Sequence, residues 1–223
     1  MKWLISEGNA DPDVTDEEGR SLAHYAVKNG NIDMVKYLVS QAGISANAID
    51  KHGQFLLHNA ALEGHFEILK WLISEGNADP RVTDQRGRSL AHLAVRHGNS
   101  SILKYLIGEK GLSANTKDKQ GHSTLHAAAQ YGNFEAIRYL LSNDVNSDVF
   151  IKDEEGKTAS DHCSDNDEHA KLFLMIAEIG RSQSEERGTD GNQERMDKVW
   201  NNLKRYMYIH PLHDQNKTGF PGW

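Results

Sequence analysis

The fold is decided by residues 118–132, which read DKQGHSTLHAAAQYG. The stretch opens with a polar four-residue turn that ends in Gly121, and it continues into a run of small apolar residues that stops at Gly132. Asp in the first place and Gly in the fourth are typical of a tight turn. Glycine also ends a helix sharply, because it adopts left-handed backbone angles at little cost. The stretch therefore predicts a turn, a short helix and a second turn.

The same pattern recurs along the whole chain. Apolar residues at Ile32, Val35, Leu38 and Val39 have the spacing of a second, bulkier helix after the first one. Three series recur at 34-residue intervals: Gly19, Gly53, Gly87, Gly121; Gly30, Gly64, Gly98, Gly132; and His24, His58, His92, His126. Three series in one register indicate an internal repeat of two helices and a turn.

These units resemble ankyrin repeats, whose pattern runs from Asp-x-x-Gly through Thr-Pro-Leu-His to Ala-Ala and Gly. Residues 121–129 match it best, whereas Leu22, Leu90 and Thr124 replace the proline and the period is 34 rather than 33. The resemblance implies an all-α solenoid of stacked helix-turn-helix units with short hairpin-like turns. It also implies a structural role for the repeat histidines, with their ring nitrogens bonded to the backbone at the turns.

The array is expected to span residues 1–180. It would comprise a partial repeat (1–15), repeats at 16–49, 50–83, 84–117 and 118–152, and a capping repeat (153–180). Residues 2–12 recur identically as 70–80, so the chain is expected to begin inside a repeat. Residues 181–195 contain no aliphatic side chain and predict a flexible linker. Residues 196–223 predict an amphipathic helix and an irregular tail, and this helix either docks on the array, binds a second protein or stays unfolded.

Composition excludes several function classes. The net charge of −7 disfavours nucleic-acid binding, and no apolar run approaches the roughly 20 residues that a membrane-spanning helix needs. Cys163 is the single cysteine, so no intrachain disulfide can form, and a reducing compartment is expected. We therefore predict a cytoplasmic location, with the nucleus as the alternative.

No catalytic or metal-binding motif stands out. The sequence has no Gly-x-Ser-x-Gly elbow and no Gly-rich phosphate loop, and Cys163 has no evident basic partner to lower its pKa. His162, Cys163 and His169 lack a second thiolate and the spacing of a zinc site. We expect neither an enzyme, nor a cofactor, nor a small-molecule ligand.

The remaining candidate is a protein-binding surface made of the turn tips and the inward side of the first helices. The three central tips are basic or neutral, and the acidic pairs 17–18 and 154–155 flank them. The residues expected to contact an acidic or mixed segment of a partner are Tyr25, Lys51, His52, Arg86, Arg88, Arg96, His97, Lys119, His122 and Tyr131. The predicted function is that of an interaction scaffold or adaptor. The alternative is a regulatory or substrate-recruiting fragment of a larger enzyme, channel or signalling protein.

Overall fold

The computed structural model describes residues 11–98, 100–142, 145, 147–163, 171, 174–175 and 177. The predicted linker and tail helix lie outside these residues. The chain divides into two compact units, Met1–Met175 and Ile176–Trp223, and everything described below belongs to the first.

Within the described residues, four pairs of helices follow one another along this unit. The first helix of each pair is, in order, α2 (Leu22–Lys28), α4 (Leu56–Glu63), α6 (Leu90–Ala94, continued by the 3-10 turn η1, Val95–His97) and α8 (Thr124–Gln130). The second is α3 (Ile32–Ser40), α5 (Phe66–Ser74), α7 (Ser100–Leu103, continued by the π-helix η2, Lys104–Glu109) and α9 (Phe134–Leu140). A fifth unit begins with the single 3-10 turn η3 (Ala159–His162).

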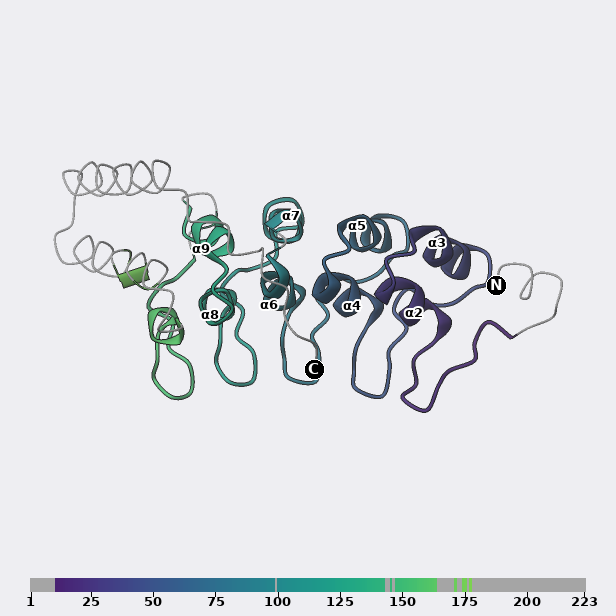
Figure 1. Ribbon diagram of the computed structural model, residues 1–223, viewed down its shortest axis with the longest axis horizontal. Helices are drawn as coiled ribbons and strands as arrows, with labels where there is room; N and C mark the ends of the chain where they lie inside the picture. Colours follow the sequence, from purple (N-terminus) through teal and green to yellow (C-terminus); the bar gives the residue numbers. More distant parts are fainter. Residues whose placement is uncertain are drawn as a thin grey trace, which may run out of the picture. The chain divides into compact units, whose positions relative to one another are not determined.

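The pairs stack in two rows. The first helices pack against one another in the order α2, α4, α6, α8, and the second helices α3, α5, α7, α9 form the row beside them. The turns that precede the first helices project together on one side (Figure 1). Antiparallel contacts at the bases of the turns, such as that of Thr15 with Ser21, are isolated bridges, and the described residues contain no strand. The predicted all-α architecture is thus confirmed.

Local sequence explains why each pair of helices forms. The glycines between paired helices all have positive φ, from 61° at Gly132 to 77° at Gly64, which lets the chain reverse within one residue. The side chain of Asn31 caps α3 by accepting a hydrogen bond from the N–H of Met34 at 3.0 Å. A further series, not predicted from the sequence, follows the second helices, where Gly43, Asn77 and Gly111 also have positive φ.

The core follows the same period. The first helices contribute small residues, of which Ala60, Ala94 and Ala128 are fully buried, so that adjacent first helices can approach closely. The second helices contribute a 34-residue series of leucines that are 0% exposed: Leu38, Leu72, Leu106 and Leu140. Each leucine contributes about 1.5–3 kcal/mol by burial, and this series holds the rows together.

Candidate functional site

Each turn is closed by the aspartate that begins it. In the third turn, Oδ1 of Asp84 accepts the backbone N–H groups of Arg86 and Arg88, both at 2.9 Å. In the fifth turn, Oδ1 of Asp153 does the same for Glu155 and Lys157. One carboxylate oxygen thus holds the backbone of the turn, while the other, Oδ2, faces the side chains around it.

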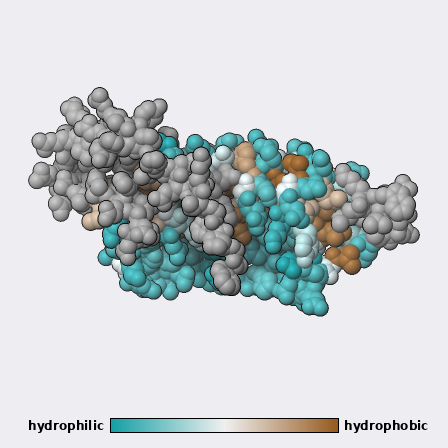
Figure 2. Space-filling model, viewed as in Figure 1, coloured by the Kyte–Doolittle hydropathy of each residue, from teal (hydrophilic) through white to brown (hydrophobic). Residues whose placement is uncertain are grey.

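Neighbouring turns are bonded to one another. The backbone N–H of Lys119 donates to the carbonyl of Arg86 at 2.9 Å, and that of Glu154 donates to the carbonyl of Gln120 at 3.0 Å. Between the second and third turns, the side-chain amide of Gln85 donates to the carbonyl of Lys51 instead. The tips therefore form one continuous row, and their side chains are presented at fixed spacing along the hydrophilic edge visible in Figure 2.

The repeat histidines lie buried at the starts of the first helices. Nδ1 of His92 accepts the N–H of Ser89 at 3.2 Å and contacts the Ser89 hydroxyl at 2.7 Å, while its Nε2 donates to the carbonyl of His122, 2.9 Å away. His24 and His126 make the same set of bonds, to Gln54 and Lys157 respectively. Each of these three rings ties its own turn to the turn of the next repeat.

The ten residues expected to bind a partner lie in different surroundings. Six are exposed at turn tips or at the ends of first helices: Tyr25, Lys51, His52, Arg86, Arg96 and Lys119. Tyr131 is exposed too, and the side chain of His97 lies outside the described residues. Arg88 and His122 are only partly exposed, because both side chains turn back toward the aspartates of the turns.

Several of these basic side chains already have an ion-pair or hydrogen-bond partner. Arg88 forms an ion pair at 2.7 Å with Asp84, whose side chain is 1% exposed. Burial would raise the pKa of Asp84, but hydrogen bonds from the side chain and backbone of Arg88 hold that pKa below its ordinary value. His52 contacts the carboxylate of Glu18, and Lys51 donates to the carbonyl of Glu17. Among the described residues, no ion-pair partner is found for Arg86, Arg96 or Lys119.

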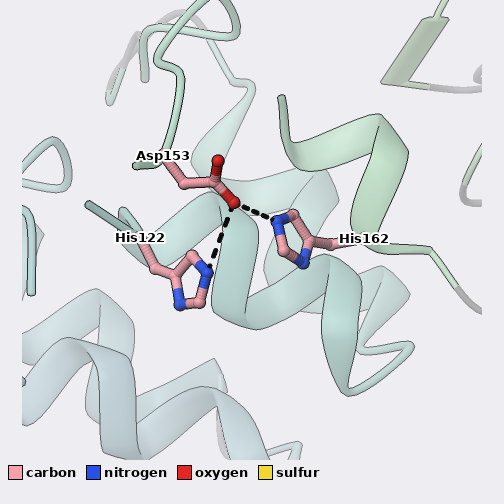
Figure 3. A group of neighbouring side chains, drawn as sticks. All are labelled: His122, Asp153 and His162. Atoms are coloured by element: carbon pink, nitrogen blue, oxygen red, sulfur yellow. Dashed lines mark hydrogen bonds and ion pairs between the residues drawn. The ribbon is translucent and has the colours of Figure 1, made fainter. Parts of the chain in front are cut away.

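A second group of side chains meets beside the last two turns. His122, Asp153 and His162 come from the fourth turn, the fifth turn and η3, and one ligand-type atom from each lies within 4.8 Å of the others (Figure 3). Nε2 of His162 lies 2.7 Å and Nε2 of His122 lies 3.5 Å from Oδ2 of Asp153. Hydrogen bonds from the Lys157 backbone and from His162 hold the pKa of Asp153 at about 2, although burial pushes it upward.

This group was not predicted from the sequence, because its members are not close together in the chain. The available sequence signal was the position of each histidine within its repeat. His122 follows the first residue of its turn, Asp118, by four places, and His162 directly follows Asp161, which replaces the repeat histidine in the last unit. Aligning the units places His162 in the register of Tyr25, which contacts the aspartate of its own turn, but it does not show that His122 reaches the aspartate of the next turn.

Comparison with known proteins agrees with this geometry. The sequence matches the family described as ankyrin repeats (three copies) over residues 1–84 and 91–183. The chain belongs to the ankyrin repeat family. Ankyrin repeats are generally protein–protein interaction modules and are typical of binding domains without catalytic activity. No curated protein matches the sequence. Among the described residues, every helix is too short or too polar to cross a membrane.

One of the four ankyrin histidines departs from the others. Phe55 stands where the other repeats carry serine, so Nδ1 of His58 accepts only the backbone N–H of Phe55, at 3.1 Å. Its ring packs edge-on against Phe55 with the centroids 5.5 Å apart. Within the described part of the chain, Nε2 of His58 makes no well-aligned hydrogen bond, although the residue is fully buried and interacts with the backbone of Val82. The second repeat therefore lacks the histidine-to-carbonyl bond to the following turn that the other three repeats possess.

These buried histidines predict acid sensitivity. Burial lowers the pKa values of His24, His58, His92 and His126 below their ordinary value of 6.5. The rings are neutral in the folded chain, and the unfolded chain binds more protons below pH 6.5, so stability falls as the pH falls. Each histidine contributes a slope of up to about 1.4 kcal/mol per pH unit. Urea unfolding followed by circular dichroism between pH 7.5 and 5 checks this, and a midpoint that does not change over that range contradicts it.

Proposed function

We propose that this ankyrin array is an interaction scaffold or adaptor that binds a partner protein along its turn tips and first helices. The observation that carries the proposal is the central basic surface, Arg86, Arg96 and Lys119. These three cations are exposed and lack ion-pair partners among the described residues, in a chain whose net charge is −7. A cation that is free in the unbound protein costs less to engage than one already paired. The single cysteine suits a cytoplasmic setting.

Two exposed aromatic side chains support the same surface. Tyr25 and Tyr131 are 41% and 44% exposed on α2 and at the end of α8. The hydroxyl of Tyr25 donates to Asp16 at 2.6 Å, and the guanidinium of Arg20 lies 5.3 Å from the centre of its ring. A tyrosine held in place loses little conformational entropy on binding, which is why such residues are good interface anchors.

Charge indicates the kind of partner. The acidic pair in the last turn, Glu154 and Glu155, lies beside the fourth turn, and the acidic pair in the first turn lies beside the second. A segment with Asp or Glu at its centre would meet the central basic surface, while an acidic flank would be repelled at either end. We therefore propose an acidic or mixed partner segment with few acidic residues at its ends.

Charge reversal tests the proposal. Peptides selected from a random display library on the wild-type chain should be rich in Asp and Glu, and should bind the triple variant R86E/R96E/K119E at least about tenfold more weakly. Their affinity should also fall as salt is raised. Arg88 is left unchanged, because a glutamate there would face the buried carboxylate of Asp84 and unfold the turn.

The matched control is K36E/K70E/K104E, which makes the same charge change at exposed lysines of equivalent register in α3, α5 and η2. It should retain wild-type affinity, because these lysines lie on the row of second helices. Equal losses in the two variants would mean that net charge alone matters, and would overturn the proposed site.

A further inference from the structure

We propose that His122, Asp153 and His162 bind one divalent transition-metal ion, with Zn²⁺ the best fit. The three side chains come from two adjacent repeats, and their ligand-type atoms already converge within 4.8 Å (Figure 3). The proposal is independent of the proposed function, because no residue of the central basic surface takes part in it.

One oxygen of the Asp153 carboxylate is held by the backbone, and only the other faces the two histidines. Oδ1 of Asp153 accepts the backbone N–H groups of Glu155 and Lys157 at 2.9 Å, which fixes the group in its turn. Oδ2 faces both imidazoles, at 2.7 Å from Nε2 of His162 and 3.5 Å from Nε2 of His122. The Asp153 side chain is only 2% exposed, so an ion there would meet an ionised carboxylate that is largely shielded from water.

His122 has a second carboxylate on the side away from Asp153. Its Nδ1 lies 3.7 Å from Oδ2 of Asp118, whose side chain is 6% exposed, which is an ion-pair distance and too long for a hydrogen bond. Shortening this contact to a hydrogen bond would orient the ring as outer-shell carboxylates orient metal-binding histidines. The backbone carbonyl of His122 is also fixed, since it accepts the hydrogen bond from His92.

The first repeat shows which side chains can stand at the two histidine positions and how they contact an aspartate. In the first repeat, Asp16 pairs with Arg20 at 2.7 Å and accepts a hydrogen bond from Tyr25 at 2.6 Å. Arg20 and Tyr25 occupy the places in the repeat that His122 and His162 occupy in the fourth and fifth units. Arginine and the tyrosine hydroxyl serve as donors in the first repeat, whereas both side chains facing Asp153 are imidazoles, which can instead offer a lone pair.

The types of ligand atom decide which metal ion fits the site. Two imidazole nitrogens with one carboxylate oxygen suit Zn²⁺, whereas Mg²⁺ and Ca²⁺ prefer oxygen ligands. Zn²⁺ at about 2.0–2.1 Å from each ligand requires ligand atoms roughly 3.3 Å apart, so Nε2 of His162 and Oδ2 of Asp153 must separate by about 0.6 Å. A rotation of the His162 ring would have to supply this separation and also bring the ligand nitrogens of the two histidines, now within 4.8 Å of each other, closer together. A water molecule would complete a tetrahedral site.

The test uses the full chain with Zn²⁺ alone, titrated calorimetrically, and with Co²⁺ as a spectroscopic probe. We expect one ion per chain and the visible absorption of tetrahedral Co²⁺. The variants H122R and H162Y copy Arg20 and Tyr25 of the first repeat, so each keeps a donor near its aspartate but loses a metal ligand. Each should weaken Zn²⁺ binding by more than the 10- to 100-fold typical of losing an outer-shell partner.

The control variant H210A/H213A removes two histidines far from the group in sequence and should leave the affinity unchanged. Circular dichroism of the metal-free variants shows whether H122R or H162Y disturbs the fold. If one of them does, the other alone is sufficient for the test. Absence of stoichiometric binding overturns the proposal. So does Zn²⁺ binding that persists in both H122R and H162Y, because the ion would then sit on other histidines of the chain.

Discussion

Replacing His92 by leucine should lower the free energy of unfolding by about 3–5 kcal/mol, whereas the same replacement at His58 should change it by less than about 1 kcal/mol. Leucine fills a similar volume, so the difference reports on hydrogen bonds rather than on cavities. The comparison is internal to the protein, since both histidines are buried at the same place in adjacent repeats.

The expected difference follows from the hydrogen-bonding groups that lose a partner when each ring is removed. Without His92, the N–H and hydroxyl of Ser89 lose their partner, and the carbonyl of His122 keeps only the hydrogen bond from the N–H of Asp118. Each unsatisfied buried group costs about 1–3 kcal/mol. Without His58, only the N–H of Phe55 loses a bond, and a buried nitrogen that made no well-aligned hydrogen bond among the described residues is removed. Urea unfolding at pH 7.5 measures both changes. A loss at His58 as large as that at His92 would refute the account.

Exchanging Gly121 for alanine should cost about 2–5 kcal/mol, and the same exchange at Gly156 only about 1–2 kcal/mol. Both glycines end a turn with φ near +80°, at 80° and 78°, so alanine is strained at either position. The neighbours differ. A Cβ on Gly121 would lie 2.9 Å from both Cα of Asp153 and the backbone nitrogen of Glu154, whereas one on Gly156 meets nothing within 4 Å.

The clash at Gly121 cannot be relieved by a side-chain rotation, because the atoms it meets are backbone. The two turns would have to move apart, which would stretch the 3.0 Å hydrogen bond from Glu154 to Gln120 and displace Asp153. G121A should therefore also weaken Zn²⁺ binding in the titration above, while G156A should affect it less. Thermal unfolding of the two variants side by side measures the difference in stability, and equal losses would show that backbone strain accounts for the whole effect.

The sequence predicts these repeats well because their signals are local. The 34-residue series at Gly30 and its equivalents marks the places where one helix stops and the next begins, and the structure has positive φ at each of them. The apolar spacing at Ile32 and Val35 predicts α3, which spans Ile32–Ser40. Backbone angles and helix faces depend on residues at most four places apart, so a single sequence carries enough information to place them.

The partners of individual side chains were beyond the reach of the sequence. Arg86 and Arg88 look alike as basic residues of one turn, yet the structure pairs Arg88 with Asp84, while Arg86 has no ion-pair partner among the described residues. His58 shares the register of His92, but the histidine-to-carbonyl bond, which spans 30 or 31 residues in the equivalent repeats, is missing there. The same holds for His122 and His162, which are 40 residues apart in sequence and converge on Asp153 only because adjacent turns are stacked.

By itself, then, the amino-acid sequence determined the repeat, its helices and its turns, because backbone conformation is chosen within a few residues. Only the tertiary structure decided which cations of the described residues lack an ion-pair partner, which histidine lacks its bond to the following turn and which two imidazoles converge on one carboxylate. Those choices depend on distances of a few ångströms between residues that stacking, and not chain connectivity, brings together.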